Sequence, residues 1–186
     1  MNLEQIEEEE IATEVIWISS ENVAKKMTNT KERSWRRVVD KHYKRIEYLN
    51  EDKKPCSGYS AITSSVSQPF ALYIRNIYGD GIYYTNQDTN KNYILAISNG
   101  EVIEGTDIYV NSALFEKYRQ FFLSDDYSSL TWICLTAAHI DEVLEANTLH
   151  KQKIKKKKIT YLSVMSMTGI VFLLLFYIAL KSFLVT

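Results

Sequence analysis

The C-terminal stretch KQKIKKKKITYLSVMSMTGIVFLLLFYIALKSFLVT (151–186) constrains this chain more than any other feature. Residues 159–180 form 22 consecutive positions without a charged side chain. At about 1.5 Å per helical residue the run extends about 33 Å, enough to cross a bilayer core of about 30 Å. It is nearly twice as long as an ordinary core helix and has no polar face, which makes a buried core helix the weaker interpretation. The sequence therefore predicts a transmembrane helix over 159–180.

A lysine cluster precedes this run and predicts its orientation. Only Lys181 follows the run, so the positive-inside rule places the N-terminal side in the cytoplasm and residues 181–186 on the far side. The opening segment MNLEQIEEEE is acidic and lacks the apolar run of a secretory signal. The six lysines that we expect to set the topology are Lys151, Lys153, Lys155, Lys156, Lys157 and Lys158.

The charge of the chain is divided between two regions. Residues 1–150 hold 15 Lys and Arg against 23 Asp and Glu, a net formal charge of −8, whereas the whole chain has −1. This contrast suits an acidic body held above anionic lipid by a basic juxtamembrane segment, 151–158. Residues 1–12 are expected to be an acidic flexible tail, and 13–150 are long enough for one cytoplasmic domain with a core. Two distant cysteines, Cys56 and Cys134, indicate free thiols.

The N-terminal part of this domain has mixed signals. The segment TEVIWIS (13–19) has the alternation of a short strand. An apolar stripe with Arg and Lys opposite predicts an amphipathic helix over 30–49, although its Val-Val pair and tyrosines leave a strand open. Residues 50–68 have the composition of a loop.

The second half of the domain predicts an α/β fold. Asn99-Gly100 is a strong type I′ hairpin signal, and the buried run 130–135 is typical of a central parallel strand. Helices are expected over 112–123, with Asn111 or Ser112 as cap, and from Thr136 onward. The remaining strands of an antiparallel meander are expected at 70–77, 81–85, 92–98 and 101–105, with a first hairpin at Tyr78–Asp80. The resulting order, β-β-β-α-β-α in one mixed sheet, predicts a ribonuclease H-like or actin-like half-domain plus one C-terminal transmembrane helix.

The residues needed for catalysis by such folds are missing from the predicted positions. A ribonuclease H-type nuclease holds divalent metals with carboxylates on adjacent elements, but 70–77 and 130–135 contain none and Glu116 stands alone. The Gly79-Asp80-Gly81 turn faintly resembles a phosphate loop, but such a sequence is more often simply a turn. We therefore expect no catalytic residues, no metal site and no cofactor.

The histidines and cysteines do not change this expectation. Cys134, His139 and Asp141 could in principle form a nucleophile trio, but their local spacing does not make one and Cys134 falls in an apolar strand. His42 lies on the apolar stripe and is better explained as a core residue.

Six basic residues form the best candidate for a binding surface. The negative charge of the domain opposes nucleic acid, so we expect no nucleic-acid binding. A solvated face is the simplest explanation of these residues, and an acidic protein partner is the functional one. The six are Arg33, Arg36, Arg37, Lys41, Lys44 and Arg45.

The segment KNYILAISNGEVIEGTDIYVN (91–111), with its strand, N-G turn and G-T-D step, resembles cytoplasmic domains of accessory inner-membrane proteins of type IV pilus and type II secretion machines. The layout of the whole chain is most similar to the bitopic platform proteins of bundle-forming (type IVb) pili. The resemblance implies an actin-like half-domain on a single-pass protein of the bacterial inner membrane, with its C-terminus in the periplasm. It departs from the larger secretion relatives, whose periplasmic domain is substantial.

The resemblance also implies a function, a non-enzymatic scaffold that links a hexameric cytoplasmic assembly ATPase to a polytopic platform protein. A stripe of small residues on the last helix can pack against a neighbouring helix; it consists of Ser163, Ser166 and Gly169. Whether the protein forms a homo-oligomer is left open. The alternative is a membrane-anchored nucleotide-binding or sensor protein with a degenerate actin-like site at Asp80. A third option, a tail-anchored eukaryotic adaptor, would call for a coiled-coil heptad before the anchor, and none is visible.

Overall fold

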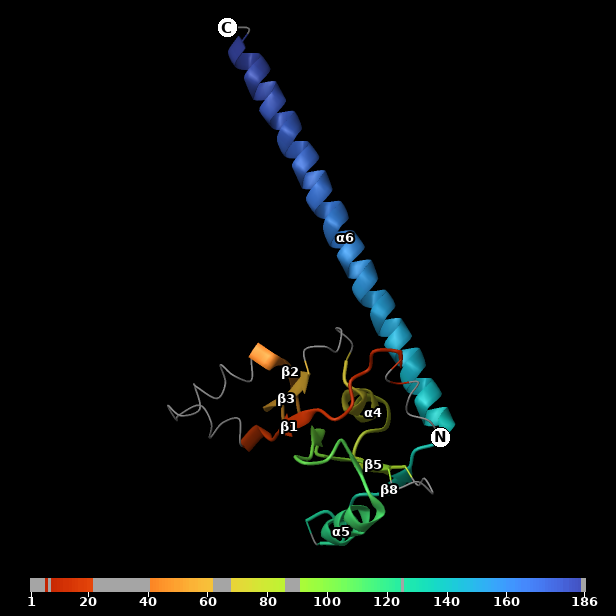
Figure 1. Cartoon of the computed structure of the whole chain (residues 1–186). Coiled ribbons are helices and arrows are strands. Elements are labelled where there is room, and N and C mark those ends of the chain that lie inside the picture. The colour runs from red at the N-terminus through yellow and green to blue at the C-terminus, as the bar shows by residue number, and fades with distance from the viewer. Residues whose placement is uncertain are drawn as a thin grey trace. The chain divides into compact units, whose positions relative to one another are not determined.

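The computed structural model describes residues 6, 8–21, 41–61, 68–85, 91–124 and 126–184, with side chains as far as residue 173 (Figure 1). The chain divides into two compact units, residues 1–147 and 148–186. Within the predicted acidic tail, Ile6 and Ile11 are buried in the core of the first unit.

A three-stranded antiparallel sheet is formed by β1 (Ile16–Ile18), β2 (Tyr43–Leu49) and β3 (Pro55–Ala61), in the order β1-β3-β2. The strand expected within 13–19 is confirmed, but the helix expected over 30–49 is wrong from Tyr43 onward; its first part, 30–40, lies outside the described residues. In β2 the half-buried Ile46 and Tyr48 alternate with exposed neighbours, so the two-residue period of a strand decides the structure.

The strand β3 replaces part of a predicted loop. Residues 55–61 form a full strand within the segment 50–68, and 62–67 lie outside the described residues. The sequence PCSGYSA is small and polar, a composition typical of loops, but the strand lies between two partners and its central residues are buried. Burial between β1 and β2 therefore overrides the local preference.

A second sheet holds the remaining strands. It has the order β6-β5-β4-β8, and β7 also pairs with β5. The Asn99-Gly100 hairpin between β5 and β6 is confirmed, with φ of 53° and 64° as a type I′ turn requires. The parallel pairing of β8 is also confirmed, but β8 lies at the edge of the sheet, beside β4, instead of at its centre. The strands are β4 (Gly81–Tyr84), β5 (Asn92–Ser98), β6 (Glu101–Val102), β7 (Ile108–Val110) and β8 (Trp132–Cys134).

The predicted strand at 70–77 is a helix, α4 (Phe70–Tyr78). Pro69 precedes the helix and its carbonyl accepts a hydrogen bond from Leu72 N at 3.0 Å. Five consecutive residues of α4 are buried, so apolar character on all sides hid the helical period. Gly79, with a φ of 79°, ends the helix. The turn at 78–80 thus connects a helix to β4 and is not a hairpin.

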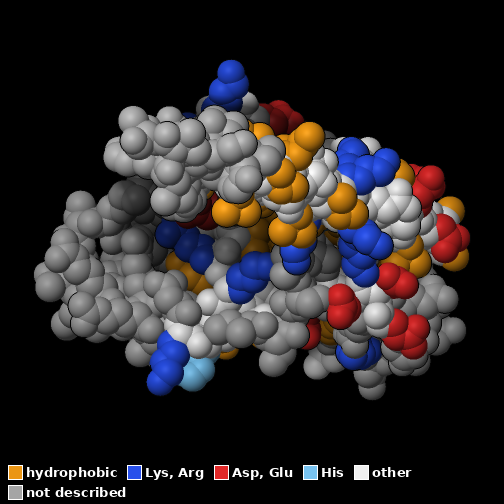
Figure 2. All heavy atoms as spheres, turned by 90° about the horizontal axis from the view of Figure 1, so that it is seen from above, with side chains coloured by type: hydrophobic (Ala, Val, Ile, Leu, Met, Phe, Trp, Pro, Cys, Tyr) orange, Lys and Arg blue, Asp and Glu red, His pale blue; other side chains and the backbone are white. Residues whose placement is uncertain are grey.

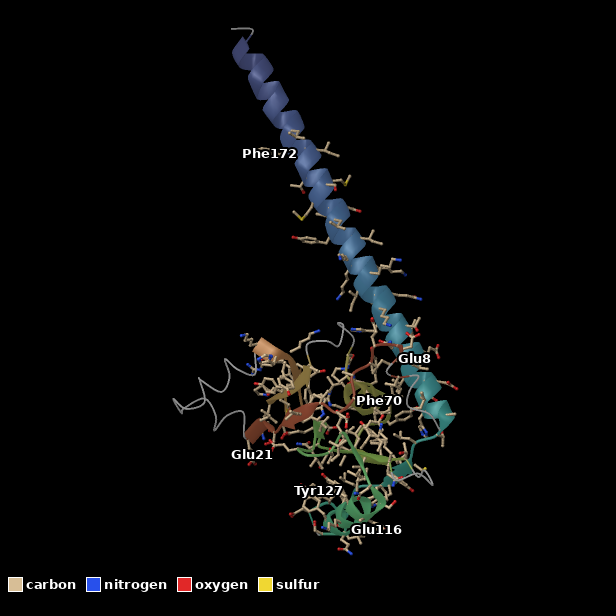
Figure 3. All side chains as sticks on the ribbon, viewed as in Figure 1. Glu8, Glu21, Phe70, Glu116, Tyr127 and Phe172 are labelled. Atoms are coloured by element: carbon tan, nitrogen blue, oxygen red, sulfur yellow. The ribbon has the colours of Figure 1, made fainter. Side chains whose placement is uncertain are left out.

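The hydrophobic core of the first unit lies on both faces of the second sheet. On one face, Tyr93, Leu95 and Ile97 of β5 pack in the same cluster as Phe70 of α4, whose side chain points into the interior (Figure 3). On the other face, Ile94 and Ala96 pack with Phe122 of α5 (Ser112–Phe122). The α5 prediction is confirmed, including its cap, since Asn111 Oδ1 accepts a hydrogen bond from Leu114 N at 2.8 Å.

The last helix, α6, runs unbroken from Ala137 to Leu184 over 48 residues. Across the part of the chain that the structure describes, no helix combines the length and the apolar composition needed to cross a bilayer. The predicted transmembrane helix over 159–180 is corrected accordingly; its side chains from 174 onward lie outside the described residues. The described apolar part, 159–173, is shorter than the roughly 20 residues that a span requires.

The predicted fold class is therefore wrong. A ribonuclease H-like or actin-like half-domain would begin with a strand at 70–77 and hold its strands in one mixed sheet. In the described residues, that segment is a helix and the strands form two sheets. The architecture is a mixed α/β arrangement of a three-stranded and a five-stranded sheet with helices α4, α5 and α6.

Candidate functional site

Asp80 has a structural role in the hairpin that it faces. Its Oδ2 accepts a hydrogen bond from Asn99 N at 2.5 Å and its Oδ1 accepts one from Gly100 N at 2.9 Å. Both carboxylate oxygens thus bind the backbone of the β5–β6 turn, across from the helix-to-strand turn that carries Asp80. Arg75 reinforces this region, donating from Nε to the Gly100 carbonyl at 2.5 Å. The geometry explains Asp80 without a nucleotide.

Replacing Asp80 by alanine should lower the free energy of unfolding by about 1–2 kcal/mol, because two turn N–H groups lose their acceptor. The measurement is urea denaturation of the full-length variant. Calorimetry with ATP and Mg²⁺ on the unmodified protein should give no binding heat. A clear binding isotherm that disappears in Asp80→Ala would instead favour the nucleotide-sensor alternative.

Cys134, His139 and Asp141 do not assemble into a nucleophile trio. His139 Nδ1 accepts a hydrogen bond from Thr136 N at 3.0 Å and lies 2.7 Å from Thr136 Oγ1, which caps the start of α6. The Cys134 thiol is exposed and its Sγ contacts the Leu135 carbonyl oxygen at 3.9 Å. Among the described residues, no three His, Cys, Asp or Glu side chains gather in a way that could hold a metal ion.

The predicted basic surface is partly described, and it lies on a strand. Arg33, Arg36 and Arg37 lie outside the described residues. Lys41, Lys44 and Arg45 are all exposed, the last two on β2, and His42 beside them is exposed instead of buried in a core. Arg45 forms an ion pair with Glu47 at 3.0 Å. The structure thus brings half of the predicted set together, at the start of one strand.

The strand β2 lies at the edge of its sheet. It pairs with β3 over seven residues, from Tyr43 opposite Ala61 to Leu49 opposite Pro55, and no other described strand pairs with it. Tyr43 and Leu49 leave 38% and 56% of their surface exposed. An exposed edge strand presents backbone N–H and C=O groups that another chain can pair with. On the face shown in Figure 2, Lys and Arg side chains lie next to hydrophobic ones.

Asp107 anchors the three-stranded sheet to the second sheet. Its side chain is fully buried and accepts four hydrogen bonds, two from backbone N–H groups of Glu14 and Val15 at 3.2 and 3.1 Å. The other two donors are Trp17 Nε1 at 2.8 Å and the Tyr93 hydroxyl at 2.5 Å. The G-T-D step of the sequence therefore builds a structural joint.

Burial governs the protonation of the Asp107 carboxyl group. Desolvation raises the pKa of Asp107 to about 7, although the four donors oppose the shift. Desolvation and the neighbouring carboxylate also raise the pKa of Tyr93 well above its usual value, so Tyr93 stays a donor. Asp107 itself has a φ of 64°, a left-handed conformation that Asp and Asn tolerate better than other side chains.

A second joint connects the end of β2 to the rest of the unit. Arg75 Nη2 donates to the Leu49 carbonyl at 2.6 Å, and its guanidinium lies 5.1 Å from the centre of the Tyr48 ring. The Tyr48 hydroxyl accepts a hydrogen bond from Val102 N at 2.9 Å, and burial raises the pKa of Tyr48. These contacts hold the edge strand β2 against two other elements, α4 and the β5–β6 hairpin.

An aromatic cavity of about 500 Å³ lies beside α5 and β8 and was not indicated by the sequence analysis. Tyr84, Phe115 and Trp132 form its aromatic wall, with ring centres 5.7 to 6.5 Å apart. The available signal was an aromatic residue on each of two predicted elements, Phe115 in the helix 112–123 and Trp132 in the strand 130–135, but their spacing along the chain does not show that they meet. The other lining residues are Asn92, Ser112, Glu116, Arg119 and Leu123.

The lysine cluster that was predicted to set the topology lies on α6 in the second unit. Every side chain from 151 to 173 is exposed, and this range includes Lys151, Lys153 and Lys155–Lys158.

Comparison with known proteins adds no relative to this picture. No protein-family model, no curated protein and no solved structure matches the chain.

Proposed function

We propose that this protein is a non-enzymatic scaffold of type IV pilus biogenesis, of the bundle-forming kind, acting at the bacterial inner membrane. It brings a hexameric cytoplasmic assembly ATPase to a polytopic platform protein. The resemblance of residues 91–111 to accessory proteins of these machines supports the proposal. Two of the side chains that the sequence offers for chemistry support it as well, since Asp80 and His139 bind the protein's own backbone.

The observation that carries the proposal is the exposed basic edge of β2. Lys41, Lys44 and Arg45 are exposed at one end of a seven-residue strand whose outer edge pairs with no described strand. The first 150 residues have a net formal charge of −8, so a positive site on them is local and directional. An acidic segment of the ATPase is the partner that fits this charge.

The docking mode follows from the strand. A partner segment in extended conformation adds to β2 through backbone hydrogen bonds, and its acidic side chains meet the basic ones of the edge. Backbone pairing supplies affinity that does not depend on sequence, whereas the charges select the partner and speed its approach. Binding should therefore weaken steeply as salt increases.

Reversing two charges on this edge tests the proposal. Lys44→Glu with Arg45→Glu should weaken binding of the cognate assembly ATPase to the full-length protein in detergent at least tenfold, because two attractive contacts become repulsive. The measurement is the dissociation constant at 0.1 M and 0.3 M NaCl, together with ATP turnover when the platform protein is present.

The matched control is Lys117→Glu with Arg119→Glu, which makes the same change of charge on the exposed surface of α5. It should leave the dissociation constant within about twofold of the unmodified value. If the unmodified protein binds no ATPase, the scaffold function is wrong. If both variants weaken binding equally, the partner responds to net charge and the β2 site is wrong.

A further inference from the structure

The exposed part of α6 has an unusual distribution of charge. Lys155, Lys156, Lys157 and Lys158 are consecutive and exposed. Because successive residues of a helix are about 100° apart, these four side chains are spread around its whole circumference. The lysines therefore form a ring about the helix axis and not a stripe on one face.

The residues that follow, 159–173, are mostly apolar, with Thr160, Tyr161, Ser163, Ser166 and Thr168 as the polar ones. Side chains from Ile159 to Leu173 are exposed, Met167 at 72% and Phe172 at 70%, and in Figure 3 they project on both sides of the helix. The two threonine hydroxyls of this stretch are satisfied within the helix. Thr160 Oγ1 donates to the Lys156 carbonyl at 3.0 Å, and Thr168 Oγ1 donates to the Val164 carbonyl at 2.9 Å.

These two features together identify the environment of the helix. A protein or a nucleic acid contacts a helix from one side and would leave about half of the lysine ring and half of the apolar surface in water. A lipid surface offers phosphate groups to the lysine ring and apolar groups to the residues beside it.

We propose that Lys155–Lys158 bind the headgroups of anionic phospholipids, with the apolar side chains beside them in contact with the same lipid surface. The inference rests on the membrane location in the proposed function and adds the lipid class that this location requires. Each lysine near an anionic surface strengthens binding by about fivefold, so the ring gives selectivity for anionic over zwitterionic lipid.

Vesicle flotation of the full-length protein tests the lipid class. We compare vesicles of phosphatidylcholine alone with vesicles that contain about 30% phosphatidylglycerol, at 0.1 M and 0.5 M NaCl. The anionic vesicles should bind the protein at least tenfold more strongly at low salt, and the difference should shrink at high salt. Replacing Lys155 to Lys158 by glutamine should abolish the preference, and replacing them by arginine should keep it.

A control variant and a comparison with duplex DNA separate lipid binding from a general response to charge. The control Lys53→Gln, Lys54→Gln, Lys91→Gln and Lys117→Gln removes the same number of charges from the first unit, away from the β2 edge, and should keep the preference. Equal binding to both vesicle types, or an unchanged preference in the glutamine variant, would overturn the proposal. So would tighter binding to duplex DNA than to anionic vesicles at equal salt. Because ATPase binding is measured in detergent, loss of lipid selectivity would leave the scaffold function standing.

Discussion

Replacing Asp107 by alanine should lower the free energy of unfolding by about 3–5 kcal/mol, the largest effect that we expect from a single polar side chain of this protein. Four buried donors would lose their acceptor at once, two of them backbone N–H groups, and each unsatisfied group costs about 1–3 kcal/mol. Alanine would also have to adopt a φ of 64°, which adds strain. Urea denaturation followed by tryptophan fluorescence measures the loss, and Trp17 lies at the site.

Asp107→Asn separates the role of the acceptors from the role of the charge. Asparagine tolerates the left-handed conformation and keeps the volume, and its amide resembles the protonated carboxyl group. We expect a loss of about 1–2 kcal/mol near pH 4.5, smaller than that of the alanine variant, because the amide keeps one acceptor oxygen.

The pH dependence of stability gives the second measurement on Asp107. Its pKa rises from an ordinary value of 3.8 to about 7 on folding, so between these values the folded state holds a proton that the unfolded state has released. Its contribution to stability is therefore complete below about pH 4 and falls as the pH rises to about 7, by on the order of 4 kcal/mol. Asp107→Asn should remove this slope. If Asp107→Asn keeps the dependence of stability on pH, or if Asp107→Ala loses less than about 1 kcal/mol, the role of Asp107 is contradicted.

The elements that sequence reasoning predicted correctly are those with strong local signals. The Asn99-Gly100 turn demands two positive φ angles, and Asn111 supplies the side-chain acceptor that begins α5. These requirements act over a few residues and do not depend on the rest of the chain. The segment 70–77 lacked such a signal, because a fully apolar run fits a buried strand and a buried helix equally well. Pro69, just before the helix, was the available hint.

Other elements could not be predicted, because their cause lies in distant residues. The strand β3 is small and polar, and it exists because β1 and β2 pair with both of its edges. The same holds for the candidate binding surface. Its basic residues were visible in the sequence, but their position on an edge strand depends on β3 and on Arg75, which binds the Leu49 carbonyl.

The contact of Gly58 with Trp17 leads to the other large prediction. A Cβ atom on Gly58 would lie 2.6 and 2.7 Å from two ring carbons of Trp17 and 2.9 Å from Val15 Cγ1. These distances are shorter than real carbon contacts, so the rigid indole would have to move. It cannot move freely, since it is 3% exposed, packs edge-on against Tyr48 and donates its Nε1 hydrogen to Asp107.

Gly58→Ala should therefore lower the free energy of unfolding by about 2–4 kcal/mol, through overpacking and a weakened bond to Asp107. The matched control is Gly169→Ala, where a Cβ meets nothing within 4 Å and helix propensity favours alanine by up to about 1 kcal/mol. In a Trp17→Leu background the cost of Gly58→Ala should fall to under about 1 kcal/mol, since the flexible leucine can yield. Equal costs in both backgrounds would mean that the indole does not restrict this position. Because β3 connects Trp17 to β2, the same substitution should also weaken ATPase binding at the β2 edge, and the charge-reversal variant should not share its loss of stability.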